Sequence, residues 1–371
     1  MGIQGLKQFL KKIAPGIFQQ HFVTDFYGKR IAIDGDNLLF GFKSTAYKQV
    51  VYQTDVAVEE PDMDKVRANF IKRLIDFTID FLYKGITPIF VFDGEHPIEK
   101  QGTKTKRRKN KQKVKDRILE LKNEISNLDI LSITPLLVTE LRKKMCQVSY
   151  VSKEDIEIAS EILRAMGIPV LNAIGDGEKL CSMLCRENKA HAVYSTDSDL
   201  LVLGTSLSIY GMGKYKYDDT SKKYVECFET VTFDGILESL SFSLETFIDL
   251  CIMSGCDYNE NIPQLGVGRS YKLLKTYKSI DNLPEKYTEK VKEYLNVDFC
   301  RSYFQYELSK NLCTHDIVLD VNTDLSNARD CLCTYKAEYA LEKLPHAYKN
   351  LPKPSTTYIS KPVQKITLVI D

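Results

Sequence analysis

Aspartate follows several short apolar runs of this sequence. Such runs, separated by helix-length segments, are typical of buried parallel strands. In an open α/β sheet, ligands bind in the crevice beyond the carboxyl ends of the strands, so we expect the side chains that follow the runs to meet there. The runs are 30–33, 87–92 and 191–196, and the acids that follow them are Asp34, Asp93, Asp197 and Asp199.

Three further acids, Asp176, Glu178 and Asp257, lie in loop or helix-start contexts that could complete this cluster. So many carboxylates facing one crevice would repel one another unless cations lay among them. Two Mg²⁺ ions roughly 3.5–4 Å apart can activate water and stabilise the leaving oxygen of a phosphodiester. The cluster therefore predicts a site for two Mg²⁺ ions, with Mn²⁺ as a substitute. A capped helix start is the alternative for Asp176 and Glu178, because carboxylates are favoured there too.

A net charge of +1 conceals a strongly basic segment. From Lys100 to Arg117 the sequence has ten basic residues and one acid. A polyanion held by this segment while metal ions act on it would account for both features. Lys100 and Arg107 lie two helical turns apart on one face, where they could neutralise a scissile phosphate. A solvated basic face is the alternative.

Two features could contact nucleic acid. Gly266 and Gly268 precede a helix and could offer backbone N–H groups to a phosphate, although an ordinary tight turn explains them equally well. Phe40 could stack on a base, but an aromatic residue at this place is by default part of the core.

The composition, 43% hydrophobic and 27% charged over 371 residues, is that of a globular protein. No apolar stretch approaches the ~20 residues of a membrane span, and the N-terminus lacks the apolar core of a signal peptide. The ten cysteines form no Cys-x-x-Cys pair and are accompanied by only five histidines, which argues against a zinc site. We expect buried thiols in a reducing compartment.

Periodicity locates the elements that must position these residues. Helices are predicted at 6–13, 64–84, 153–167, 176–187, 244–254 and from 266 to about 278. Strands are predicted at 30–34, 87–92, 170–171 and 192–196, with a hairpin in 208–228. Residues 100–150 lack strand character and predict helices that stand off the sheet. Beyond His346 the sequence predicts a poorly ordered tail.

Taken together, the sequence resembles the flap endonucleases of the XPG superfamily of structure-specific nucleases. Met166–Pro169 precedes the paired acids, as it does in the family. The resemblance covers roughly residues 1–110 and 150–280. Further matching blocks are Met1–Leu6, Ile33-Asp34, Val91–Gly94, Thr196–Asp199 and Ser254–Tyr258.

This resemblance implies an α/β fold with a mostly parallel central sheet flanked by helices, a PIN-like nuclease core. It also implies a helical arch, through which a 5′ single strand passes, and a helix-two-turn-helix element that grips duplex phosphates. The implied divisions are an N-terminal nuclease region at 1–99, a basic arch at 100–150, an internal nuclease region at 151–280, a C-terminal helical region at 281–346 and a flexible tail at 347–371.

The resemblance also implies roles for individual residues. The two-metal site would consist of Asp34, Asp93, Asp176, Glu178, Asp197, Asp199 and Asp257. Lys100 and Arg107 would act on the scissile phosphate. The DNA-binding residues would be Gly2, Phe40, Gly266, Gly268 and Arg269, with K⁺ at the helix-two-turn-helix.

Three departures from the family pattern stand out. Asp176 replaces the usual glutamate, so a water could bridge the missing methylene. Phe40 replaces a common tyrosine. The segment Val363–Asp371 has no aromatic pair of the kind that binds a sliding clamp, which argues against that partner. We expect a monomer in the nucleus or at a viral replication site.

The predicted function is Mg²⁺-dependent cleavage of DNA near junctions of single strand and duplex, in replication and repair. Water activated by the ions would be the nucleophile, leaving 5′-phosphate and 3′-hydroxyl ends. Three alternatives remain open at this point: a 5′→3′ exonuclease of the same superfamily, a non-cutting DNA-junction binder, and an RNA-directed nuclease.

Overall fold

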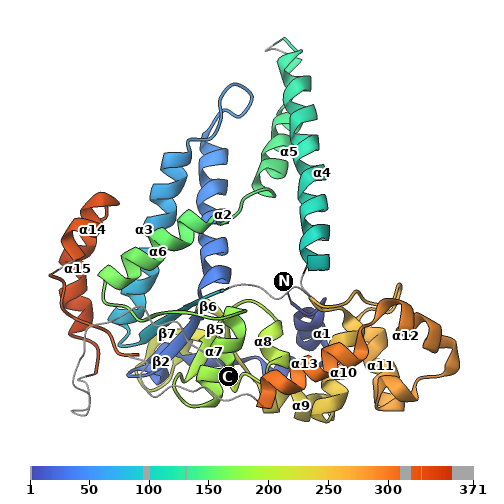
Figure 1. Ribbon diagram of the computed structural model, residues 1–371. Coiled ribbons are helices and arrows are strands. Elements are labelled where there is room, and N and C mark those ends of the chain that lie inside the picture. The colour runs from blue at the N-terminus through green and yellow to red at the C-terminus, as the bar shows by residue number, and fades with distance from the viewer. Residues whose placement is uncertain (1, 95–100, 130–131, 310–318, 327, 353–371) are drawn as a thin grey trace.

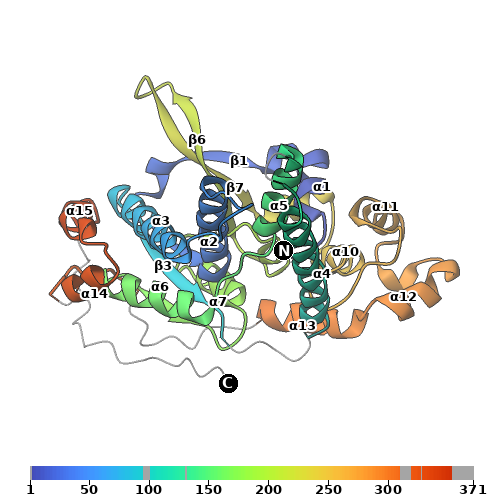
Figure 2. The ribbon, with the colours of Figure 1, turned by 90° about the horizontal axis from the view of Figure 1, so that it is seen from above.

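The computed structural model of the chain describes residues 2–94, 101–129, 132–309, 319–326 and 328–352. Its centre is a seven-stranded sheet with the strand order β1-β7-β6-β5-β2-β3-β4 (Figures 1 and 2). The strands are β1 Gln19–Phe22, β2 Arg30–Asp34, β3 Thr87–Phe92, β4 Val170–Asn172, β5 Ala192–Tyr194, β6 Leu207–Asp218 and β7 Lys223–Thr232.

The five strands from β6 to β4 are parallel, and β7 and β1 add two antiparallel pairings at one edge. This arrangement confirms the predicted α/β fold with a mostly parallel sheet. Helices cover both faces, since Ile31 and Ile33 of β2 belong to one hydrophobic cluster while Ala32 between them belongs to another. Alternate residues of a strand point to opposite faces, which explains why these strands are apolar throughout.

The helices connect and flank these strands. They are α1 Leu6–Ile13, α2 Gly35–Gln53, α3 Met63–Tyr83, α4 Gln101–Ser126, α5 Pro135–Cys146, α6 Lys153–Ala165, α7 Gly177–Arg186, α8 Asp199–Val202, α9 Phe233–Leu240, α10 Leu244–Ser254, α11 Val267–Tyr277, α12 Thr288–Tyr294, α13 Val297–Ser309, α14 Ala328–Thr334 and α15 Tyr339–Tyr348. No helix in the described ranges combines the length and the apolar character that crossing a bilayer requires.

Local signals fix where the helices begin and end. The side chain of Ser152 accepts a hydrogen bond from the backbone N–H of Asp155, whose own carboxylate accepts one from the backbone of Ser152, which makes a capping box for α6. The helix ends before Gly167, which has a φ of 66°, a backbone conformation that glycine adopts without steric cost. For this reason α6 is slightly shorter than the predicted helix 153–167.

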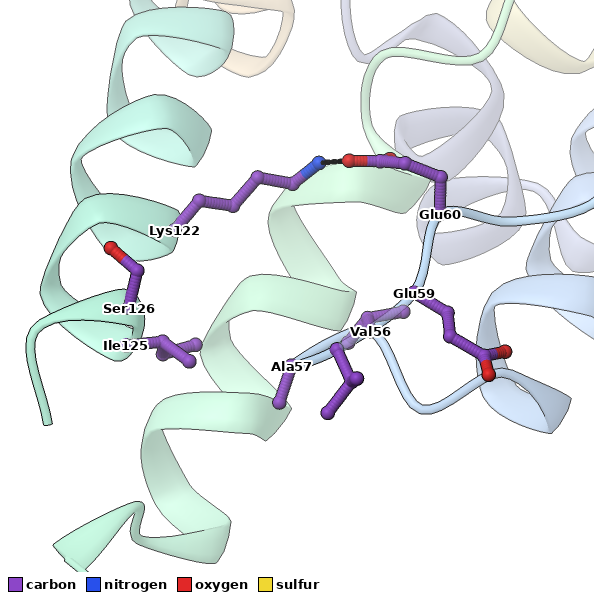
Figure 3. Close-up of a pocket in the computed structure, with 8 residues that line it drawn as sticks. Val56, Ala57, Glu59, Glu60, Lys122, Ile125 and Ser126 are labelled. Carbon is purple, nitrogen blue, oxygen red and sulfur yellow. Dashed lines mark hydrogen bonds and ion pairs between the residues drawn. The ribbon is translucent and has the colours of Figure 1, made fainter. Parts of the chain in front are cut away.

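Helices α4 and α5 extend away from the sheet beside α2 (Figure 1), as predicted for this segment. Their inner faces form a small hydrophobic cluster with the end of α2 and the loop that follows it. Figure 3 shows a pocket at this junction, where Lys122 of α4 pairs with Glu60 of the α2–α3 loop. These contacts join the end of the helix pair that is far from the sheet to the end of α2 and the loop after it (Figure 1).

The end of the described chain returns to the first half of the fold. Helix α15 packs on α3 and continues through Tyr348, whose hydroxyl donates to the carbonyl oxygen of Met166 at 2.6 Å. Ala347 is fully buried. The flexible tail was predicted to begin at 347, which is too early because the helix continues through Tyr348. Residues 353–371 of the predicted tail lie outside the described residues.

Candidate active site

Asp34 lies at the carboxyl end of β2 and also begins α2. Its Oδ1 accepts a hydrogen bond from the backbone N–H of Asn37 at 3.2 Å, so the predicted strand-end acid is the N-cap of the following helix. The hydroxyl of Ser195, just after β5, donates to the other oxygen at 2.7 Å. The side chain is only 3% exposed.

The pKa of Asp34 is raised to about 7. Burial is the largest cause, and the negative charges of Asp93 and Asp197 raise it further, against the lowering effect of the hydrogen bonds from Ser195 and Asn37. Carboxylates that follow three different strands thus act on one another electrostatically, as their places at one edge of a parallel sheet predict.

Asp93 follows β3 and contacts the start of α7. Its Oδ1 accepts the backbone N–H of Gly177 at 2.6 Å, while its own N–H donates to Asp36 at 2.7 Å. Asp36, in the first turn of α2, therefore has a structural role. These bonds hold the ends of β2 and β3 beside the helix that carries Glu178.

Asp197 and Asp199 occupy a buried turn between β5 and α8. The N–H of Asp199 donates to Oδ1 of Asp197 at 3.2 Å. The N-terminal segment lies directly on this turn, because a Cβ added at Gly2 would come within 2.0 Å of the same oxygen, at a φ of 86°. Gly2 is therefore at the candidate site, as the resemblance implied, and only glycine fits there.

Asp176 is held by groups that the sequence did not single out. One oxygen, Oδ2, lies 3.4 Å from the Tyr258 hydroxyl, 3.5 Å from the Tyr303 hydroxyl and 3.6 Å from Nζ of Lys179. Nζ of Lys179 also lies 4.3 Å from the centre of the Tyr303 ring. Helix α13 thus contributes a side chain to the site.

The remaining predicted acids lie around the same region. The charge of Glu178 acts on the buried thiol of Cys181 together with those of Asp34 and Asp93. Asp257 is half-buried in the turn after α10, next to Tyr258. Six of the acids therefore act on shared neighbours, and Asp257 adjoins Tyr258, whose hydroxyl lies near Asp176. The six are Asp34, Asp93, Asp176, Glu178, Asp197 and Asp199.

The electrostatic interactions among these acids do not by themselves make a metal-binding site. In the parts of the chain that the structure describes, no three His, Cys, Asp or Glu side chains form a group that could hold a metal ion. The metal-ligand assignment of the seven acids stays a prediction.

The chemistry of the donors nevertheless fits a hard divalent cation. Carboxylate oxygens are the ligands that Mg²⁺ and Mn²⁺ prefer. Burial, and to a smaller extent the charges of Asp93 and Asp197, raise the pKa of Asp34. A cation there would offset both effects.

The two predicted basic residues are not placed by the structure. Lys100 lies outside the described residues, and Arg107 belongs to α4 but its side chain is not among those described.

Phe40 lies on α2 and is 43% exposed. The expectation that an aromatic residue at this place belongs to the core is therefore wrong. Its stacking on a base stays a prediction.

The predicted helix-two-turn-helix is present as α10 and α11, which pack together. Gly266 is the N-cap of α11, and a Cβ there would meet nothing within 4 Å, so the helix start is open to a ligand. Gly268 lies near Phe9 with ordinary contact distances. The guanidinium of Arg269 donates to the carbonyl oxygen of Gln264 at 2.7 Å and thus stabilises the preceding turn. DNA contacts here, and K⁺, stay predictions.

Sequence reasoning missed four residues of the site. Ser195 and Tyr210 are buried polar residues, and the Tyr210 hydroxyl donates to the carbonyl oxygen of Asp197 at 3.1 Å. Lys179 follows Asp176 by three positions, a helical spacing that could have indicated the pair. Nothing near Tyr303 in sequence indicated its role.

The sequence matches known families over much of its length. Residues 1–114 match the XPG N-terminal domain, and residues 167–257 match the XPG I-region. Flap endonuclease 1-1 of Paramecium tetraurelia is 31% identical over 370 residues, which cover 96% of this chain and 89% of the relative. The chain belongs to the flap endonuclease family. Flap endonuclease 1 of Entamoeba histolytica is a further family member, 29% identical over 86% of this chain and 77% of its own length.

Solved structures show the same fold. A flap endonuclease-1 from Methanococcus jannaschii has a TM-score of 0.57 at 24% identity, covering 90% of this chain and 97% of its own. The catalytic core of Rad2 in complex with a DNA substrate has a TM-score of 0.58 at 20% identity, covering 92% and 100%. The family's architecture therefore extends over nearly all of this chain, and the chain is a nuclease of this family.

Proposed function

We propose that this protein is a structure-specific 5′ nuclease that cuts DNA where a 5′ single-stranded flap leaves a duplex. The observation that carries the proposal is that Asp34, Asp93 and Asp197 follow the neighbouring parallel strands β2, β3 and β5, where Asp34 is buried and the charges of the other two act on it. Family membership and the DNA-bound relative with this fold support the choice of substrate.

Divalent ions would be held at the carboxyl ends of β2, β3 and β5. When bound, Mg²⁺ supplies Lewis-acid polarisation of a phosphoryl oxygen and makes water more acidic. Asp34 and Asp197, each 3% exposed, would bind an ion directly. The carboxylate of Asp176 instead lies beside the ammonium of Lys179 and two tyrosine hydroxyls. We assign Asp176 an outer role, in line with its shorter side chain.

The protein's own residues would position the substrate. Gly2 and Ile3 lie against the Asp197–Asp199 turn and limit the space above it. The helix pair α4 and α5 stands off the sheet (Figure 1), and the basic first half of α4 would attract a single strand. The open N-terminus of α11 would accept a duplex phosphate.

The test is cleavage of a labelled 5′-flap substrate with Mg²⁺ and with EDTA. We expect endonucleolytic cutting near the junction with Mg²⁺ alone, 5′-phosphate on the product, and loss of cutting in Asp197→Asn with DNA binding largely retained. A blunt duplex labelled at the 5′ end serves as the comparison, because stepwise digestion of it without flap cutting would assign the protein to the exonuclease branch. Cutting by Asp197→Asn at the wild-type rate would overturn the proposal.

A further inference from the structure

Three lysines surround one buried carboxylate on the side of the sheet next to the candidate active site. Nζ of Lys11 lies 2.9 Å from Oε2 of Glu229, and Nζ of Lys214 lies 2.6 Å from Oε1. Glu229 is 8% exposed, while both lysines remain partly open to solvent. Lys7, one helical turn before Lys11 on α1, is the third cation.

This cluster carries excess positive charge. Three ammonium groups face one carboxylate, which leaves a local formal charge of +2. Burial, Lys11 and Lys214 lower the pKa of Lys7, and Glu229 only partly opposes them. The lysines outweigh the effect of burial on Glu229 and lower its pKa. Glu229 thus fixes two ammonium groups in place without neutralising the group as a whole.

The cluster contacts the candidate active site through Tyr210. Nζ of Lys7 lies 4.3 Å from the centre of the Tyr210 ring, and the hydroxyl of that ring donates to the carbonyl oxygen of Asp197. Strand β6 runs parallel to β5, with Tyr194 opposite Ile209. Lys214, further along β6, therefore lies beyond the same carboxyl edge as Asp197.

We propose that Lys7, Lys11 and Lys214 form a binding site for backbone phosphates of a DNA strand that runs past β6 next to the metal-binding acids. The ligand class follows from the chemistry, because fixed ammonium groups with excess charge suit phosphodiester oxygens and read no base. Glu229 is a positioning residue of this site. The inference rests on the proposed nuclease function only in taking DNA as the source of the phosphates.

The experiment is binding of a fluorescent 5′-flap DNA, followed by anisotropy with Ca²⁺ in place of Mg²⁺, over a series of salt concentrations. The variant is Lys11→Met/Lys214→Met. Each lost phosphate contact should reduce the slope of log K against log salt by about 0.9. We therefore expect a slope smaller by about 1.8 and an affinity at least roughly tenfold lower near 100 mM salt.

The chain offers a matched control. Lys72 and Lys343 share Asp76 in the same way, at 2.8 and 3.8 Å, on the α3–α15 face. Lys72→Met/Lys343→Met removes the same number of charges and should leave the slope at the wild-type value. Equal slopes for the two double variants would overturn the inference.

Two single variants guard against misfolding. Lys7→Met leaves both Glu229 ion pairs in place and should reduce the slope by about 0.9. Glu229→Gln keeps an oxygen that accepts a hydrogen bond from a lysine but removes the negative charge, so it should bind DNA more tightly, whereas a purely structural ion-pair network predicts no gain. A wild-type protein that cuts no flap would refute the proposed function alone. If the wild type cuts flaps while Lys7→Met and Lys11→Met/Lys214→Met bind DNA with the wild-type salt slope and affinity, this inference alone is refuted.

Discussion

The buried ion pair between Lys43 and Asp155 offers a quantitative test of how α2 is held over the sheet. Nζ of Lys43 lies 2.6 Å from Oδ1 of Asp155, and the two side chains are 10% and 5% exposed. The pair joins α2, which begins at Asp34, to α6. Removing one partner leaves the other charge buried, which costs about 3–5 kcal/mol.

The expected cost of Lys43→Met lies at the lower end of this range. Oδ2 of Asp155 keeps two hydrogen bonds from Ser152, from the backbone N–H and the hydroxyl, each at 2.9 Å. Methionine also preserves the apolar stem that packs near Phe70. We expect the free energy of unfolding in urea at pH 7 to fall by about 3 kcal/mol.

The cost should depend on pH in a defined direction. In the wild type, burial raises the pKa of Asp155, but hydrogen bonds from Lys43 and Ser152 outweigh it, so the pKa is lowered. The ionised carboxylate therefore stabilises the fold above its unfolded pKa of about 4, and this contribution is lost as the pH falls through the lower folded value. Without Lys43, only the Ser152 hydrogen bonds oppose the effect of burial, so the pKa of Asp155 is higher than in the wild type. The difference in stability between the two proteins should therefore shrink as the pH falls from 7 towards the unfolded pKa of about 4.

A neighbouring exposed pair is the control. Arg67 and Glu154 also join a helix to α6, at 2.9 Å, but their side chains are 43% and 60% exposed. Arg67→Met should cost no more than about 1 kcal/mol. If Lys43→Met cost as little as this control, or lost the same free energy at pH 7 and at about pH 4, the argument from burial would be wrong.

Four further predictions address the site and its support. Gly2→Ala should abolish flap cutting without unfolding the protein, because the added Cβ would lie 2.0 Å from Oδ1 of Asp197; circular dichroism and a cleavage assay measure the two effects. In EDTA, the raised pKa of Asp34, due first to burial, should make the wild type lose thermal stability as the pH rises through about 7, and neither Asp34→Asn nor the Mg²⁺-saturated wild type should show that loss. Tyr303→Phe should raise the Mn²⁺ concentration needed for half-saturation, measured by electron paramagnetic resonance, with an unchanged melting temperature, because it removes a hydroxyl 3.5 Å from Asp176. Arg301→Met should lower the free energy of unfolding by about 3–5 kcal/mol, since Arg301 donates to both oxygens of the buried Asp249 at 2.7 Å; Arg301→Lys should restore only part of it.

The strands and the acids that follow them could be predicted because two local signals occur together there: an apolar run and a polar residue that ends it. Apolar runs buried on both faces gave β2 and β3 their bounds, and the acid that ends each run is also the first polar group that the following turn requires. For Asp34 this double role is visible as the N-cap of α2. Local pattern and global topology agree at such places.

The rest of the site depends on long-range packing that leaves no local signal. Tyr303 reaches Asp176 from a helix far along the chain, and its surroundings show only weak periodicity. The end of α15 was missed for a similar reason, since Pro345 within the helix and the prolines after it favour a break. Packing on α3 overrides that preference, as tertiary contacts often do.

The return of α15 to α3 also constrains how the protein is made. The apolar side of α3 is translated first, but Ala340, Leu344 and Ala347, which join the same hydrophobic cluster, follow more than 250 residues later, since α3 ends at residue 83 and α15 begins at residue 339. At a translation rate of about 5–20 residues per second, the apolar side of α3 stays uncovered for roughly 10–50 s before α15 is made. A nascent or cleaved chain that stops before Tyr339 therefore presents an uncovered apolar strip to chaperones and proteases, and shortening the gene from its 3′ end would yield an aggregation-prone fragment and not a smaller nuclease.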